Sequence, residues 1–251
     1  MTIVRADKRD RTAIAGCILA VTALAWIYLL HISNATGAMA QMEMPAPISG
    51  GAASLFLAFA MWEVMMIGMM TPTIAPTLTL FAGIHRSKRT AGAGSAIFCF
   101  ALGYLVVWLG FSAIAVVLQS ALTKAALLTP AMSSASPVLG GAILLCAGVY
   151  QLLPAKTACL RQCRTPLDFL ITHWRDGAIG ALEMGFRHGT FCLGCCWALM
   201  CVLFVVGVMN LAWVGALTAF ILFEKLGRAG KIIGRAGGVL LLLWGGVLIL
   251  K

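Results

Sequence analysis

The sequence predicts an all-α, polytopic transmembrane helical bundle. Apolar residues make up 61% of the 251 residues, charged residues make up 10%, and the mean hydropathy is +0.99. Soluble domains are nearer half apolar and a quarter charged, so this chain has too few polar side chains to cover a water-exposed surface. The composition also excludes a disordered chain and a secreted disulfide scaffold. We expect a single integral membrane domain over residues 1–251.

Long apolar runs predict about seven membrane spans. Several runs exceed the roughly 20 residues that cross about 30 Å of hydrocarbon. The predicted spans are 13–32, 55–84, 93–122, 137–153, 177–209, 211–223 and 236–250. A basic segment, 154–176, separates the fourth span from the fifth, and we expect it to be a cytoplasmic loop.

The positions of Lys and Arg predict the orientation. They cluster before the first span, after the second, after the fourth, and between the sixth and seventh. With the N-terminus inside, every Lys and Arg except Lys124 and Lys251 lies on the cytoplasmic side, as the positive-inside rule requires. We therefore expect an N-in, C-out topology. The formal net charge of +10 is then explained by topology and by contact with anionic lipid headgroups, and we expect no nucleic-acid partner.

The second span carries a methionine-rich face. At about 100° per residue, Met65, Met66 and Met69 project from one broad face, and Glu63, Met66 and Met70 form the adjacent row. Thioether sulfur suits Cu(I), and a carboxylate beside it could act as a ligand or counter-ion. Methionine also fills gaps in apolar cores, so packing is the alternative interpretation.

The fifth span contains Cys192, Cys195 and Cys196, with His188 one turn earlier. On a helix these side chains share one face. Imidazole together with thiolates suits zinc or copper, and neighbouring methionines favour Cu(I). In the alternative interpretation His188 lies at the cytoplasmic interface and the cysteines pack as small apolar residues.

The basic loop contains a second thiol pair. Cys159 and Cys163 are four residues apart, a spacing that lets two thiols on one helical face chelate a soft metal. Adjacent Lys and Arg would lower the pKa of both thiols. The alternative is a short amphipathic helix on the anionic leaflet. The sequence has no phosphate-binding loop or nucleophile elbow, which argues against an ATP-driven pump or a hydrolase and makes an enzymatic role less favoured.

Three motifs lie far apart in this chain. The first is Trp-x-x-Met-x-x-small-Met-Met-x-Pro, at Trp62, Met65, Gly68, Met69, Met70 and Pro72. The second is Tyr-Gln-x-x-Pro-x-Lys-x-x-Cys-Leu-x-x-Cys-Arg-x-Pro, at Tyr150, Gln151, Pro154, Lys156, Cys159, Leu160, Cys163, Arg164 and Pro166. The third is Arg-His-Gly-x-x-Cys-x-Gly-Cys-Cys-Trp-x-x-Met, at Arg187, His188, Gly189, Cys192, Gly194, Cys195, Cys196, Trp197 and Met200.

With these motifs the chain resembles a family of uncharacterised bacterial integral membrane proteins described as predicted metal-binding proteins. The resemblance covers most of the chain. It implies a metal site in a protein of the bacterial inner (cytoplasmic) membrane, and it specifies neither the metal nor a reaction.

Our first hypothesis is a soft-metal site between the second and fifth spans, for metal handling or delivery to another membrane protein. The metal would most reasonably be Cu(I), with zinc as the alternative. The candidate ligands are Met65, Met69, Met70, Cys192, Cys195, Cys196, His188, Glu63 and Met66, with Cys159 and Cys163 as secondary candidates. A second hypothesis is a membrane thiol-redox enzyme that uses the Cys-x-x-Cys-Cys cluster. A third is a structural or partner-binding membrane subunit.

Overall fold

The computed structural model describes residues 8–41, 51–87, 93–129 and 132–250. These residues form α-helices and, apart from one isolated bridge between Leu128 and Ser134, no β-structure. The all-α fold is therefore confirmed. The helices are α1 (Lys8–Gln41), α2 (Ala52–Ser87), α3 (Ala93–Lys124), α4 (Pro137–Leu152), α5 (Pro154–Arg164), α6 (Pro166–Thr172), α7 (Gly177–Cys201), α8 (Leu203–Val206), α9 (Leu211–Leu226) and α10 (Gly230–Leu250).

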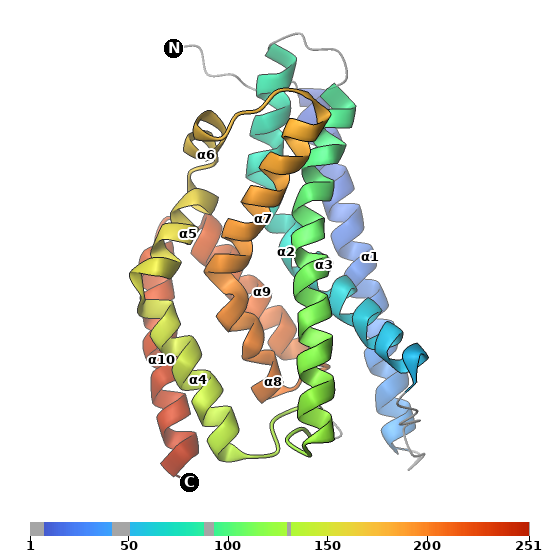
Figure 1. Ribbon diagram of the computed structural model, residues 1–251, viewed down its shortest axis with the longest axis vertical. Helices are drawn as coiled ribbons and strands as arrows, with labels where there is room; N and C mark the ends of the chain where they lie inside the picture. The colour runs from blue at the N-terminus through green and yellow to red at the C-terminus, as the bar shows by residue number, and fades with distance from the viewer. Residues whose placement is uncertain (1–7, 42–50, 88–92, 130–131, 251) are drawn as a thin grey trace.

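The helices differ in height along the long axis of the molecule. In Figure 1, α2, α3 and α7 reach the top of the molecule, whereas α4 and α10 occupy only the lower half and end near the level of α5. Helix α1 packs on α2, α2 on α3, α3 on α7, and α4 on α10. Helix α5 packs against α7 and also contacts α9. Helix α4 also contacts α7.

Five helical segments among the described residues are long and apolar enough to cross a membrane. They are Arg11–Asn34, Ala52–Arg86, Gly94–Lys124, Gly177–Val206 and Gly230–Leu250. Helices α4 and α9 have 16 residues each, which at 1.5 Å per residue gives only about 24 Å. These findings are consistent with a membrane protein, and the count of seven spans and the N-in, C-out orientation remain predictions.

Two prolines alter the backbone of α2. Pro72 and Pro76 have no N–H, so each removes a bond of the helical ladder. Beside them, the Met70 carbonyl oxygen accepts hydrogen bonds from Thr73 Oγ1 at 2.8 Å and from Tyr104 Oη at 3.2 Å. This stretch of α2 is thereby joined to α3 by a polar contact inside an otherwise apolar core.

The predicted loop 154–176 contains two helices. Leu153 has an extended backbone after α4, and Pro154 begins α5 at an angle of 63° to α4. Thr165 interrupts the helix again, and Pro166 begins α6. Proline suits the first position of a helix because its missing N–H has no partner there, and it disfavours helical geometry in the residue before it. This bend places α5 across α7 instead of in line with α4.

Glycines bring the backbones of α3 and α7 together. A side chain at Gly103 would collide with the Leu182 carbonyl oxygen, and one at Gly185 would collide with the Phe100 carbonyl oxygen. Small residues at such crossings allow close approach of membrane helices. Tyr104, the residue after Gly103, therefore lies directly against the middle of α7.

Candidate functional site: a thiol cluster beside a buried lysine

Five cysteines from two helices gather at the place where α5 crosses α7. We call Cys159 and Cys163 of α5 and Cys192, Cys195 and Cys196 of α7 the thiol cluster. The Cys163 thiol interacts with those of Cys192 and Cys195. A Cβ placed at Gly194 would lie 2.9 Å from Cys159 Sγ, so this sulfur rests on α7 as well. The two cysteine motifs, expected at separate places, therefore lie side by side.

Cys192 is the most connected member of the cluster. Lys225 Nζ, from α9, donates to Cys192 Sγ at 2.8 Å. Tyr104 Oη, from α3, lies 3.0 Å from the same sulfur, and Thr73 Oγ1, from α2, lies 3.8 Å from it. Polar groups of three neighbouring helices therefore converge on one sulfur atom that is itself buried.

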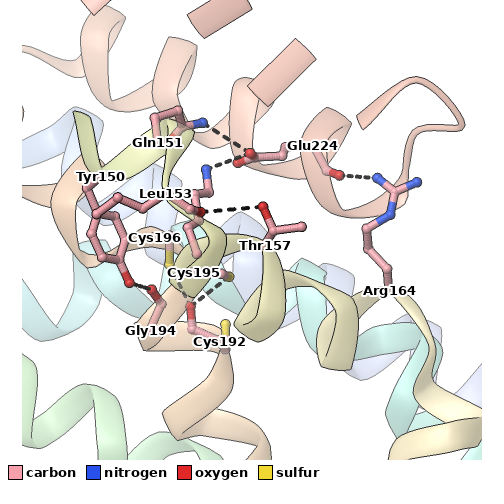
Figure 2. A network of polar contacts seen from close by, with 11 residues as sticks. Tyr150, Gln151, Leu153, Thr157, Arg164, Cys192, Gly194, Cys195, Cys196 and Glu224 are labelled. Carbon is pink, nitrogen blue, oxygen red and sulfur yellow. Dashed lines mark hydrogen bonds and ion pairs between the residues drawn. The ribbon is translucent and has the colours of Figure 1, made fainter. Parts of the chain in front are cut away.

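The other two α7 cysteines bond to their own helix. Cys195 Sγ and Cys196 Sγ donate to the Cys192 carbonyl oxygen at 3.0 and 2.9 Å, as Figure 2 shows. Within the described residues, no three His, Cys, Asp or Glu side chains already stand as a metal-binding group. At this site two thiols are directed at the backbone, and a rotation about each Cα–Cβ bond would redirect them.

A buried positive charge accompanies the cluster. Lys225 is 5% exposed, and the carboxylate of the preceding residue, Glu224, is bound to Lys156 instead. A buried charge without a partner is costly, and the contact made by the Lys225 ammonium is with Cys192. The ammonium thus places a positive charge beside the Cys192 thiol, and a neighbouring positive charge favours the thiolate form of a cysteine.

The expected effect of basic neighbours on the loop cysteines is wrong for Cys159. Burial raises the pKa of the Cys159 thiol, and the neighbouring Cys195 adds to this effect. The nearby cations do not offset it, because Lys156 is engaged with Glu224 and Arg164 donates to backbone carbonyls of the α9 end.

His188 lies one turn from Cys192 but faces an aromatic pocket. Its Nε2 is 3.3 Å from Thr77 Oγ1, and the rings of Phe100, Tyr104 and Phe169 surround it at centroid distances of 6.1, 6.0 and 5.0 Å. It is 2% exposed, so the ring packs inside the bundle, and its depth relative to the membrane surface stays a prediction. Its Nδ1 has no hydrogen-bond partner among the described residues.

The methionine face of α2 is fully internal. Met65, Met66, Met69 and Met70 are each at most 1% exposed. Helix α2 reaches α7 through Thr73 and Thr77, which follow these methionines in the chain. The second and fifth predicted spans therefore do meet, through the hydroxyl groups of Thr73 and Thr77.

Glu63 lies apart from the thiol cluster. Its Oε2 accepts a hydrogen bond from Ser112 Oγ at 2.8 Å, which joins α2 to α3. It precedes Thr73 by ten residues, or about 15 Å along an α-helix. The carboxylate is thus satisfied locally, far from the sulfur atoms of Cys192 and its neighbours.

Sequence reasoning did not identify three residues that touch Cys192. Tyr104 is a single polar residue in an apolar run, Thr73 is one of four threonines between residues 71 and 79, and Lys225 was counted among the topogenic charges. The available signal was the adjacent Glu224 and Lys225 at the end of an apolar run, because paired opposite charges at such a position often have internal partners. Lys156 and Lys225 are both buried, so they do not serve as headgroup contacts.

Comparison with known proteins adds a family assignment. No curated protein matches this chain, and no solved structure does. A family model described as PpoB2, copper chaperone, matches residues 59–248. The matched segment includes the methionine face, the thiol cluster and Lys225. The chain belongs to the PpoB2 copper chaperone family.

Proposed function

We propose that this protein carries copper as Cu(I) on the thiol cluster and passes it to a partner protein in the bacterial inner membrane. The observation that carries the proposal is the packing of α5, which bears Cys159 and Cys163, directly on the stretch of α7 that bears Cys192, Cys195 and Cys196. Sulfur ligands select soft ions, of which Cu(I) is the member that agrees with the family assignment.

The surroundings of the cluster favour a transferable ion over a permanent structural one. Structural zinc sites hold four ligands in a closed tetrahedron. Here Cys195 and Cys196 bond to a carbonyl oxygen and Lys225 contacts Cys192, so each of the three α7 thiols has another partner when no metal is bound. A site that remains satisfied without its ion can release that ion at lower cost, because it leaves no unpaired polar group behind.

The methionine face enters the proposal as a second set of soft ligands. Met65, Met66, Met69 and Met70 lie on α2 between Glu63 and Thr73, and Thr73 touches the thiol cluster. This order would let copper pass along α2 toward Cys192. His188, one turn from Cys192, is assigned a supporting position because its Nε2 is already paired with Thr77.

The experiment measures copper bound to detergent-purified protein after anaerobic loading with Cu(I). We expect stoichiometric copper in the wild type and its loss in a Cys192/Cys195/Cys196→Ser variant. The matched control is Cys17→Ser with Cys146→Ser, because both residues are exposed cysteines outside the cluster. Equal copper in the triple variant and the control would contradict the proposal. Metal-free protein with a thiol-to-disulfide mass change would instead support the thiol-redox alternative.

A further inference from the structure

Helix α5 is a separate segment that covers the α7 cysteines. It has 11 residues, and non-helical residues, Leu153 and Thr165, stand at its two ends. Cys192, Cys195 and Cys196 are each 1% exposed, so a copper donor or acceptor cannot reach them in this arrangement. Helix α7 is held against α3 by backbone contacts at glycines and is poorly placed to move. The element that can uncover the cysteines is therefore α5.

A buried ion pair holds the beginning of α5 in place, and its carboxylate also binds the end of α4. Lys156 Nζ donates to Glu224 Oε1 at 2.5 Å, and Gln151 Nε2, from the end of α4, donates to the same oxygen at 3.0 Å. Figure 2 shows the Gln151 amide directed at the Glu224 carboxylate. Lys156 and Glu224 are 1% and 2% exposed, so solvent does not compete with this ion pair.

The end of α5 is held by a different kind of contact. Arg164 Nη1 donates to the Glu224 carbonyl oxygen at 2.5 Å, and Nη2 donates to the Gly227 carbonyl oxygen at 2.9 Å. The last carbonyl groups of a helix have no partner within the helix and carry partial negative charge, which a guanidinium satisfies well. Both ends of α5 are thus attached to the same residues at the end of α9.

Glycines at the start of α10 provide the space for these contacts. A Cβ at Gly234 would collide with Glu224 Oε1 and would lie 3.3 Å from Glu224 Cδ. A Cβ at Gly230 would collide with Arg164 Nη1 and with the Glu224 carbonyl oxygen. By contrast, a Cβ at Gly246 of the same helix would meet nothing within 4 Å.

We propose that Lys156, Glu224 and Arg164 form a latch that positions Cys159 and Cys163 of α5 on the α7 cysteines. Opening the latch swings α5 about Leu153 and Thr165 and exposes the thiol cluster to a copper donor or acceptor. These three are positioning residues, since they act through α5, and the hydrogen bonds that join α5 to the end of α9 run from nitrogen to oxygen and involve no sulfur. That copper is the ion exchanged rests on the proposed function, whereas the control of access to the thiols by α5 does not.

The test labels metal-free, full-length protein in detergent with a maleimide and maps each cysteine by mass spectrometry. Gly234→Ala displaces the Glu224 carboxylate without changing any charge, and Gly246→Ala is its matched control. Glu224→Gln is a second variant that weakens the ion pair. We expect Cys159 and Cys163 to react about tenfold faster in Gly234→Ala and Glu224→Gln than in Gly246→Ala, because breaking a buried pair favours local opening.

Cys99 and Cys201 separate latch opening from general unfolding. Both are partly buried and lie outside the cluster. Latch opening leaves their labelling rates unchanged, whereas unfolding raises the rates of all partly buried cysteines together. Unchanged labelling of Cys159 and Cys163 in both latch variants, or a parallel rise at Cys99 and Cys201, would overturn the proposal.

A second readout uses copper. After loading with Cu(I), the latch variants should release copper to a soluble Cu(I) chelator about tenfold faster than Gly246→Ala, because opening exposes the sulfur atoms. If the protein binds no copper while the labelling result is as expected, the proposed cargo fails and the latch stands. If copper binds but release and labelling are unchanged in the latch variants, the latch fails and the proposed function stands.

Discussion

The close contact between α3 and α7 predicts that Gly185→Ala lowers the free energy of unfolding. In Gly185→Ala, the new Cβ would collide with the Phe100 carbonyl oxygen and would lie 2.8 Å from the Phe100 carbonyl carbon. These are backbone atoms, so the clash cannot be relieved by a side-chain rotation and the two helices must separate. Tyr104 and Cys192, whose side-chain contact is 3.0 Å, lie on the separating surfaces.

The expected size of the effect follows from two opposing contributions. Overpacking a close contact costs up to about 3 kcal/mol, and alanine is favoured over glycine within a helix by about 1 kcal/mol, so Gly185→Ala should destabilise by ~2 kcal/mol. The matched control is Gly110→Ala on α3, where a Cβ would meet nothing within 4 Å. That variant should be neutral or more stable by at most about 1 kcal/mol.

Unfolding in detergent, followed by circular dichroism against denaturant, measures this difference. The same samples are labelled with a maleimide, and Cys192 should react faster in Gly185→Ala because its contact with α3 is lost. Equal stability of the Gly185→Ala and Gly110→Ala proteins would refute the close approach of α3 and α7. Unchanged labelling of Cys192 would refute the part of the reasoning that links this packing to the thiol cluster.

Three further substitutions test single contacts. Trp62→Phe removes the 2.6 Å hydrogen bond to Gln119 Oε1, so a buried acceptor loses its donor. We expect the free energy of unfolding, measured with a chemical denaturant, to fall by about 1–3 kcal/mol. Trp197→Phe, at an exposed tryptophan, is the control and should cost less. Tyr104→Phe removes the hydroxyl that contacts Cys192 Sγ and the Met70 carbonyl oxygen, and it should lower the free energy of unfolding by about 1 kcal/mol. Tyr28→Phe, at an exposed tyrosine, is the control, and equal stability of the two variants would argue against the polar contact. Gly194→Ala would crowd only Cys159 Sγ, the end of a side chain, so we expect less than about 1 kcal/mol of destabilisation but faster maleimide labelling of Cys159, and a large loss of stability would contradict this packing.

Much of the helical pattern is predictable from composition. The predicted spans 55–84 and 93–122 lie within α2 and α3, because long apolar runs with at most one charged residue have few alternatives to helix in a membrane. The last span was predicted from residue 236, whereas α10 begins at Gly230. The difference arises because hydropathy excludes Lys231 and Arg235, although charged residues form helix readily.

The composition of the thiol cluster is not predictable from periodicity. Helical spacing correctly grouped Cys192, Cys195 and Cys196, because their relation is local to one helix. The addition of Cys163 depends on the 63° bend between α4 and α5, which sets one helix across another. A sequence pattern indicates where a helix is interrupted, but the direction of the following helix is decided by tertiary contacts such as Arg164 with the end of α9.

The sequence does not reveal which lysines contact lipid headgroups and which lie inside the bundle. Lys156 and Lys225 fit the positive-inside pattern by position, yet both are buried and contact Glu224 and Cys192 respectively. A rule that counts charges between spans treats every lysine alike, and the choice between headgroup and internal partner depends on which helix ends meet. The burial of the α2 methionines does not distinguish packing from metal binding, because both roles place methionine inside the bundle.

The most direct test of the account is X-ray absorption at the copper edge of Cu(I)-loaded protein in detergent. We expect a first coordination shell made of sulfur atoms. The copper–sulfur signal should be lost in a Cys163→Ser/Cys192→Ser variant and kept in a Cys17→Ser/Cys146→Ser variant. A first shell of nitrogen or oxygen atoms, or an unchanged sulfur shell in the Cys163/Cys192 variant, would contradict the assignment of copper to the thiol cluster.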